Sequence, residues 1–143
     1  MYQYKCNILE VIDGDTVKVD IDAGFNIWIK SLSIRLIGID TPESRTSNEV
    51  EKLFGNVSKS VVQTLLPVGS TQIVQTTIDD KYGRLLGDFL IEGKSLCDLL
   101  IAEGYAVPYS GQNKSSIAKL HLANRKRLIK EGKVQLPSTA QVV

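Results

Sequence analysis

The sequence predicts an α+β protein in which a five-stranded OB-fold β-barrel carries three α-helices. Two observations predict this class. Five segments have the alternation or the β-branched content of strands, and three have apolar residues at helical spacing. One helix separates the third strand from the fourth and two helices follow the fifth, which is the order of an OB-type barrel with helical packing. The order alone also fits other α+β arrangements.

The strands and helices follow one another with short turns between them. We predict strands at 4–12, 16–21, 27–39, 70–78 and 84–91 and helices at 48–66, 95–103 and 115–131. Val17, Val19 and Ile21 alternate with polar residues, so they form the inward row of the second strand. The apolar phase of the third strand slips between Ile29 and Leu32, which predicts a bulge or a sharp bend.

Capping residues mark the ends of the helices. Ser47 is the predicted N-cap of the first helix, and Pro67 lies just beyond its end. Ser95 and Gly104 bound the second helix. The segment DDKYG predicts a hairpin turn between the last two strands. The last helix has three apolar residues on one face: Ile117, Leu120 and Leu128.

The length of 143 residues favours one domain. We expect this domain to occupy residues 1–134 and a disordered C-terminal tail to occupy 135–143. No segment approaches the roughly 20 apolar residues of a membrane span, so we expect no membrane partner. The N-terminus has neither the basic nor the apolar region of a signal peptide, which favours a cytoplasmic location and leaves secretion from a longer precursor open. We expect a monomer.

Charge is unevenly spread along the chain. The net charge is only +1, but residues from Lys114 onward carry +6 and residues 1–113 carry −5. A basic end permits a polyanionic partner without requiring one. The two cysteines, Cys6 and Cys97, have no second cysteine or histidine at ligand spacing, so we expect both to be buried and reduced.

Two aspartates extend inward rows just past the apolar part of their strands. Asp15 shares the parity of Val17 in the second strand, and Asp40 shares the parity of Leu36 in the third. A short connection predicts that these strands form an antiparallel hairpin, so both carboxylates should meet at one mouth of the barrel. Arg35, of opposite parity to Leu36, should leave the barrel wall near the same end. A bulge or a bent third strand must absorb an offset in this pairing.

Facing carboxylates repel each other unless a positive charge lies between them. Hard divalent cations prefer oxygen ligands, and Ca²⁺ also accepts backbone carbonyls and waters. Asp15, Asp40 and a carbonyl near Thr41 would therefore form a partial cage that is open to a substrate oxygen. Each residue has an ordinary structural explanation when taken alone, because Asp-Gly-Asp often makes a turn and a strand arginine often faces solvent. Only their convergence on one mouth indicates a metal site.

Three ordered motifs resemble the thermonuclease (staphylococcal or micrococcal nuclease) family. They are VIDGDTVKV, IRLIGIDTPE and DKYGR, and the resemblance runs from about Cys6 to Gly132. It implies an OB-type barrel with three helices and a Ca²⁺-dependent phosphodiesterase that acts on DNA and RNA and leaves 3′-phosphate ends. We expect single-stranded nucleic acid to be favoured.

The resemblance also implies roles for individual residues. It assigns metal binding to Asp15, Asp40 and the carbonyl of Thr41, catalysis to Arg35, Glu43 and Arg84, and substrate binding to Lys81, Tyr82 and Tyr109. Phosphodiester hydrolysis needs an activated water and neutralisation of charge on the phosphate oxygens. Glu43 would activate the water, and the guanidiniums would clamp the oxygens with planar forks. Asp13 and Thr16 either support these groups or are plain turn residues.

The family also contains barrels that bind ligands without catalysis. The alternative function is therefore a nucleic-acid-binding OB barrel with little or no activity. The five acidic and basic residues of the catalytic and metal positions are all present, which favours the nuclease. A protein-interaction module has no positive support. The near-neutral charge departs from the strongly basic, secreted family member and argues against tight nonspecific binding of polyanions.

The remaining candidates have ordinary structural explanations. His121, the only histidine, lies outside the motifs, and we expect a structural or surface residue rather than a base. Phe25 and Trp28 near the hairpin tip are expected to pack rather than to stack on bases. The last helix is basic, and its charged residues include Lys119, Arg125, Lys126, Arg127 and Lys130. These residues could contact nucleic acid, but a charged helix usually forms a solvated face, and we expect the solvated face.

Overall fold

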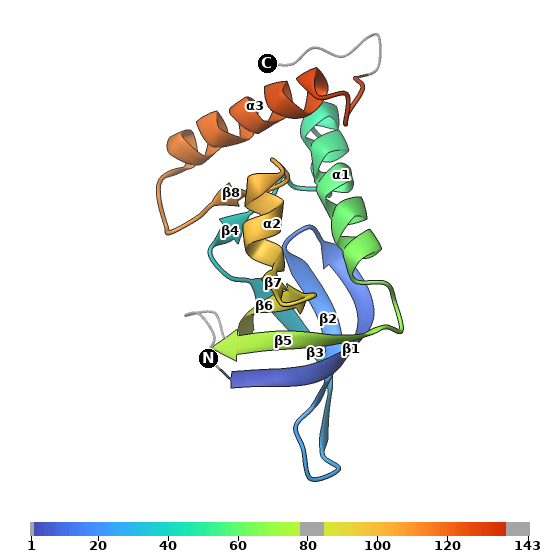
Figure 1. Ribbon diagram of the computed structural model, residues 1–143. Helices are drawn as coiled ribbons and strands as arrows, with labels where there is room; N and C mark the ends of the chain where they lie inside the picture. The colour runs from blue at the N-terminus through green and yellow to red at the C-terminus, as the bar shows by residue number, and fades with distance from the viewer. Residues whose placement is uncertain (1, 78–84, 137–143) are drawn as a thin grey trace.

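The computed structural model describes residues 2–77 and 85–136 (Figure 1). In chain order the elements are β1 (Tyr2–Asp13), β2 (Thr16–Asp22), β3 (Trp28–Leu36), β4 (Ile39–Asp40), α1 (Glu49–Leu65), β5 (Thr71–Thr77), β6 (Leu85–Ile91), β7 (Lys94–Ser95), α2 (Leu96–Ala102), β8 (Val107–Pro108) and α3 (Lys114–Lys130). The predicted hairpin turn, Lys81, Tyr82 and Arg84 lie outside the described residues.

A closed barrel forms the body of the molecule. Its strands are hydrogen-bonded in the order β3-β2-β1-β5-β6, and a parallel pairing of β3 with β6 closes the ring. All neighbouring pairs other than β3–β6 are antiparallel. The inward row of β2, Val17, Val19 and Ile21, is buried as the alternation predicted. The prediction of a five-stranded OB-fold barrel with three helices is confirmed.

The third strand is shorter and more irregular than the predicted 27–39. A register shift separates the pairs Val19–Leu32 and Ile21–Ile29, and Ser31 has a φ of 58°, so the predicted bulge is present. The barrel strand ends at Leu36. The chain then turns at Gly38, which has a φ of 73° that favours glycine, and continues as the separate strand β4.

β4 belongs to a two-stranded sheet of its own with β8. Ile39 pairs with Pro108 and Asp40 pairs with Val107. Tyr109, just after β8, donates its backbone N–H to the carbonyl of Gly38 at 2.8 Å. The prediction that Asp40 continues the inward row of the third strand is therefore wrong, because a glycine turn interrupts the parity count.

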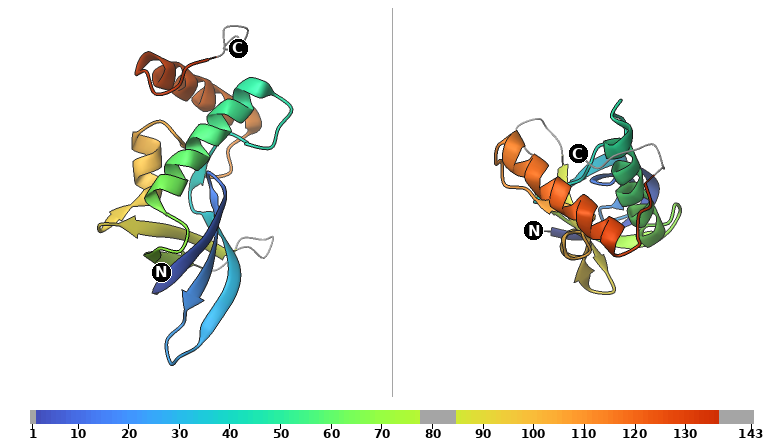
Figure 2. Two further views of the ribbon diagram at one scale, coloured as in Figure 1. Left: turned by 90° about the vertical axis from the view of Figure 1, so that its right-hand side faces the viewer. Right: turned by 90° about the horizontal axis from the view of Figure 1, so that it is seen from above.

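Two helices pack close to the barrel and the third lies across its end. α1 packs along β1, and α2 inserts the fully buried Leu96 and Leu100 into the main apolar core. The N-cap of α1 is Asn48, whose side chain accepts from the N–H of Glu51, rather than the predicted Ser47. Ser95 caps α2 as predicted. Figure 2 shows α3 at the end of the molecule opposite to the β2–β3 hairpin.

α3 buries only part of the predicted apolar face, because Ile117 and Leu128 lie on its inward side and Leu120 does not. Leu128 is buried, but Leu120 is 41% exposed. Half-buried residues of α3 include Ile117, His121 and Asn124, which with Leu128 follow a spacing of four, three and four residues. Leu128 joins Phe54 and Val134 in a second apolar cluster between α3 and α1, separate from the barrel core. α3 is therefore held mainly through α1 and the β4–β8 sheet.

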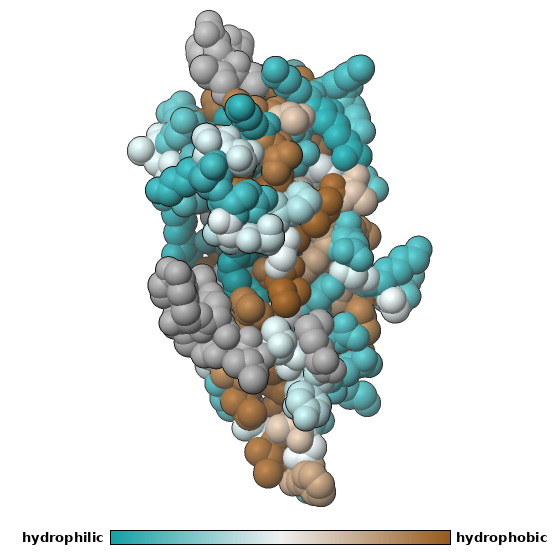
Figure 3. Space-filling model, turned by 90° about the vertical axis from the view of Figure 1, so that its left-hand side faces the viewer, coloured by the Kyte–Doolittle hydropathy of each residue, from teal (hydrophilic) through white to brown (hydrophobic). Residues whose placement is uncertain are grey.

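The β2–β3 hairpin projects from the barrel with an apolar tip. Phe25 is 97% exposed and Trp28 is 42% exposed, so the prediction that they pack is wrong. Figure 3 shows hydrophobic side chains at this lower end of the molecule. Among the described residues, the one cation–π contact of Trp28 is with Lys30, whose ammonium lies 5.4 Å from the centre of the ring.

Both cysteines are buried and reduced, as predicted. Burial raises the pKa of the Cys6 thiol to about 11, and burial with the nearby Asp88 carboxylate raises the pKa of Cys97 still further. No helix in the described ranges is long and apolar enough to cross a membrane. Leu136 packs on the second cluster, and residues 137–143 of the predicted tail lie outside the described residues.

Candidate active site

The β1–β2 turn brings Asp15 close to two other segments. A Cβ atom at Gly14 would lie 3.0 Å from Cβ of Ser58 on α1 and 3.1 Å from Oγ1 of Thr41. The absence of a side chain therefore lets the turn approach both segments. Asp15 accepts a hydrogen bond from the hydroxyl of Thr16 at 3.1 Å, so Thr16 does support this carboxylate.

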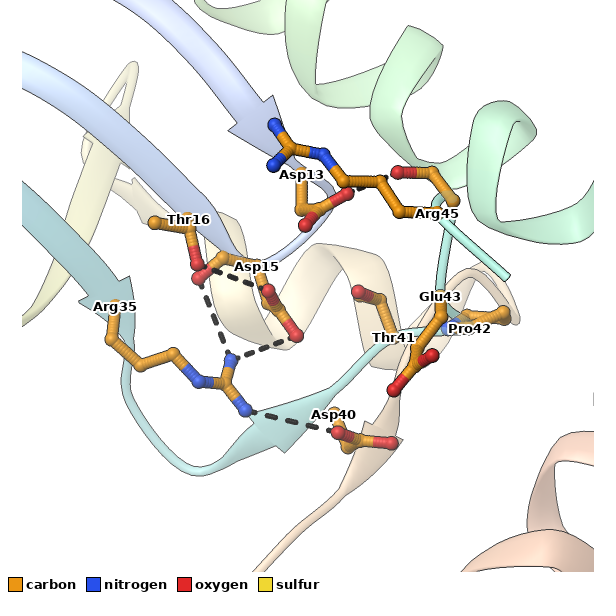
Figure 4. Close-up of a pocket in the computed structure, with 10 residues that line it drawn as sticks. Asp13, Asp15, Thr16, Arg35, Asp40, Thr41, Pro42, Glu43 and Arg45 are labelled. Carbon is orange, nitrogen blue, oxygen red and sulfur yellow. Dashed lines mark hydrogen bonds and ion pairs between the residues drawn. The ribbon is translucent and has the colours of Figure 1, made fainter. Parts of the chain in front are cut away.

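Arg35 on β3 lies between the two aspartates (Figure 4). Its Nη1 is 3.0 Å from Oδ2 of Asp15, and its Nη2 is 3.8 Å from Oδ1 of Asp40. The guanidinium also donates to the backbone carbonyl of Ile39 at 3.1 Å. Because Arg35 is largely buried, these ion pairs are less screened by water than surface pairs. The positive charge expected between the carboxylates is thus supplied in part by the chain itself.

Asp40 reaches the same place from the β4–β8 sheet. Its Oδ2 lies 2.7 Å from Nε2 of His121 on α3. His121 lies outside the motifs in the sequence, but the fold brings its side chain into contact with a motif residue, so of the two expected roles the structural one fits and the surface one does not. The signal was present in the sequence, because His121 shares a helical face with Ile117 and Leu128. The helical spacing did not reveal, however, that Asp40 would be the partner of His121 on that face.

The segment after β4 carries Glu43 into the site. Figure 4 shows the Glu43 carboxylate pointing toward the same cavity as Asp40. The backbone of this segment lies directly on α1 at Gly55, where a Cβ atom would meet the carbonyl of Glu43 and lie 2.6 Å from the nitrogen of Ser44. The hydroxyl of Ser44 also donates to Asp13. Asp13 thus anchors the segment that presents Glu43.

Five of the predicted site residues line one open cavity of about 410 Å³: Asp15, Arg35, Asp40, Thr41 and Glu43. A second cavity of about 580 Å³ adjoins it and shares four of these residues. The second cavity reaches Tyr109, which is partly exposed, and Lys114 and His121 on α3. The structure therefore brings together the predicted metal and catalytic residues of its described part and places Tyr109 beside them.

The chemistry of these donors can be tested against a metal ion. Within residues 2–77 and 85–136, no group of three or more His, Cys, Asp or Glu side chains is arranged to hold a metal. Two aspartates and a backbone carbonyl are available instead, and all are oxygen donors. Such a set suits a hard cation that keeps several waters, as Ca²⁺ does, and does not suit a cation that prefers nitrogen or sulfur ligands.

Comparisons with known proteins identify the family of the chain. A family model described as staphylococcal nuclease homologue matches residues 33–136. The chain is 34% identical over 97 residues to Endonuclease YncB of Bacillus subtilis, covering 66% of this chain and 43% of that protein. It is 33% identical over 97 residues to SPbeta prophage-derived endonuclease YokF of the same species, covering 66% of this chain and 31% of that protein.

A thermonuclease is also among the relatives. The chain is 31% identical over 103 residues to Thermonuclease of Staphylococcus hyicus, covering 69% of this chain and 56% of that protein. The chain spans less than half the length of the two Bacillus subtilis proteins.

Proposed function

This chain belongs to the staphylococcal nuclease family, and from that membership we propose that it is a Ca²⁺-dependent endonuclease that hydrolyses phosphodiester bonds of DNA and RNA and leaves 3′-phosphate ends. The observation that carries the proposal is the single cavity in which Arg35 lies between Asp15 and Asp40 while Glu43 points into the same space. The names of the relatives, endonuclease and thermonuclease, support the nucleic-acid substrate.

The chain's own residues divide the work of hydrolysis. Glu43 is an exposed carboxylate, so it can hold a water and accept its proton as the water attacks phosphorus. The bond from phosphorus to the 5′ oxygen then breaks, the leaving 5′ oxygen takes a proton from solvent water to become a 5′-hydroxyl, and the phosphate stays on the 3′ oxygen. Arg35 can donate its planar fork to the phosphate oxygens that gain charge.

Asp15 and Asp40, with the Thr41 carbonyl, would hold the cation. A bound Ca²⁺ would supply positive charge to a phosphate oxygen and to the attacking water. In the structure the two aspartates share Arg35 as a counter-charge. A cation bound by these aspartates would neutralise their charge and so leave the Arg35 guanidinium available to the substrate. Arg84 as the second clamp, and Lys81 and Tyr82 as contacts of a terminal phosphate, are part of the proposal through the family resemblance.

The substrate we favour is single-stranded. Tyr109 lines the cavity next to the catalytic one and is partly exposed, and an aromatic ring there can stack on an unpaired base. We propose that the protein acts as a monomer.

A cleavage assay with end-group analysis tests the proposal. Single-stranded DNA should be cut in Ca²⁺ and left intact in excess chelator. Mg²⁺ should support much weaker cleavage because it demands a tighter octahedron. The products should carry 3′-phosphates that a phosphatase removes. Glu43→Gln should lower kcat more than it weakens nucleotide binding.

Other outcomes would favour different functions. Full activity in chelator would refute the role of Ca²⁺. Tight binding of DNA without cleavage under every metal condition would favour the alternative, a nucleic-acid-binding barrel with little or no activity.

A further inference from the structure

The two aspartates of the candidate metal site are supported in different ways. Asp15 follows β1, a strand of 12 residues, and its carboxylate lies 3.0 Å from Arg35 and 3.1 Å from the Thr16 hydroxyl. Asp40 lies on a strand of two residues, and its ion pair with Arg35 is 3.8 Å long. A separation of 3.8 Å is too long for a hydrogen bond. The barrel therefore fixes Asp15 more firmly than Asp40.

His121 is the close partner that Asp40 does have. The distance of 2.7 Å from its Nε2 to Oδ2 of Asp40 is that of a charge-assisted hydrogen bond. Since a carboxylate oxygen accepts, the imidazole donates through Nε2. The His121 side chain is only 11% exposed, and its other ring nitrogen has no hydrogen-bond partner among the described residues. Within the described residues, the hydrogen bond to Asp40 is therefore the only one that this largely buried imidazole makes.

α3 is held in register with the β4–β8 sheet on this face. Asn124, less than one turn beyond His121, donates its side-chain amide to the carbonyl of Ala106 at 3.1 Å, next to β8. β8 in turn pairs with the strand that carries Asp40. The imidazole therefore approaches Asp40 from a helix that is itself anchored to the same small sheet.

We propose that His121 is a positioning residue for the metal site, which holds Oδ2 of Asp40 so that Oδ1 stays directed at the cavity and at the cation. The proposal rests on the proposed function only in that it takes Asp40 to be a metal ligand. Without the imidazole, the Asp40 carboxylate would be free to rotate, and the cation would have to order it on binding. Outer partners of metal ligands of this kind contribute about 10- to 100-fold to affinity.

The test measures Ca²⁺ binding by isothermal titration calorimetry, without substrate, on the full chain. His121→Ala removes the donor and should raise the Kd for Ca²⁺ about 10- to 100-fold. His121→Gln keeps an amide nitrogen at nearly the reach of Nε2, so its Kd should stay within about fivefold of the wild type. Leu120→Ala is the matched control, because Leu120 is the neighbouring residue on the exposed face of α3, and its Kd should not change.

Two further measurements separate positioning from folding. Denaturant unfolding in chelator should show that the variants used for titration are folded. In the cleavage assay, a high Ca²⁺ concentration should return kcat of His121→Ala toward the wild-type value, because the site is weakened rather than removed. If His121→Ala does not fold, the test compares the Ca²⁺ affinities of His121→Gln and Leu120→Ala. A loss of affinity in His121→Gln but not in Leu120→Ala would show that an amide donor does not replace the imidazole, and would refute the proposal.

The outcomes distinguish this inference from the proposed function. If the wild type binds Ca²⁺ and His121→Ala binds it within twofold, the positioning role is refuted and the metal site stands. Equal losses in His121→Ala and Leu120→Ala would attribute the effect to helix packing and refute it as well. If the wild type binds no Ca²⁺, both the metal site and the positioning role are refuted.

Discussion

Gly55→Ala should lower activity although it replaces a poor helix former with the best one. In an exposed helix interior this change stabilises by about 1 kcal/mol. Gly55 is buried on α1, however, against the backbone of the segment that carries Glu43. A methyl group there would lie 2.6 Å from the Ser44 nitrogen, against 3.4 Å for ordinary contact, so the segment must move by at least about 0.8 Å.

The size of the effect follows from that displacement. A misplacement of about 1 Å at a reacting group costs on the order of 100-fold in rate. Overpacking of a close contact costs about 1–3 kcal/mol, which offsets or exceeds the helix gain. We therefore expect kcat to fall on the order of 100-fold while the free energy of unfolding stays equal or falls.

The assays are DNA cleavage at saturating substrate and urea unfolding in chelator. Asn56→Ala is the matched control, because it raises helix propensity at the next, exposed position and should leave kcat unchanged. If Gly55→Ala gains about 1 kcal/mol and keeps wild-type kcat, the backbone contact does not position Glu43 and the reasoning fails.

Three more changes test other parts of the structure. Arg35→Lys should lower kcat at least ~100-fold, since one ammonium cannot replace the planar fork; a rate within fivefold of the wild type would show that the fork is not needed. Asp15→Asn should lower the free energy of unfolding in chelator by about 1–2 kcal/mol, because it removes the 3.0 Å ion pair with Arg35, and a gain in urea unfolding would show that like-charge repulsion dominates. For Cys6, whose pKa rises from 9.0 unfolded to about 11 folded, the stabilisation is fully present below pH 9 and is lost as the pH rises through 11. The unfolding free energy of the wild type minus that of Cys6→Ala should therefore fall between pH 9 and 11, and a constant difference would contradict burial of the neutral thiol.

The expected sign for Asp15→Asn shows where the sequence misleads. From the sequence alone, two facing aspartates without a metal predict repulsion, and neutralising one of them should relieve it. Arg35 was expected near the same end, but its distance to either carboxylate depends on the turn at Gly38 and on the bulge at Ser31. Arg35 pairs with Thr16 in the register beyond the bulge, so its guanidinium lies 3.0 Å from Asp15, and this ion pair changes the expected sign.

Patterns along single strands predicted the barrel well, because burial of one face imposes a period that each strand carries by itself. Parity failed at Asp40, since it assumes a continuous strand. The expectation that Phe25 and Trp28 pack failed for a different reason, because an apolar residue at a hairpin tip packs only if another element reaches it. For Leu120 and His121 the helical period was present, but polarity alone suggested the wrong member as the inward one.

The two apolar clusters have a consequence for the order in which the molecule is assembled. The barrel core draws on the strands, α1 and α2, and contains no side chain of α3 among the described residues. The contact between Asp40 and His121, by contrast, needs α3, which follows every residue of the barrel core in the chain. The barrel core can therefore form before α3 docks, and on the positioning role inferred for His121 the metal site is fully ordered only once this helix has docked.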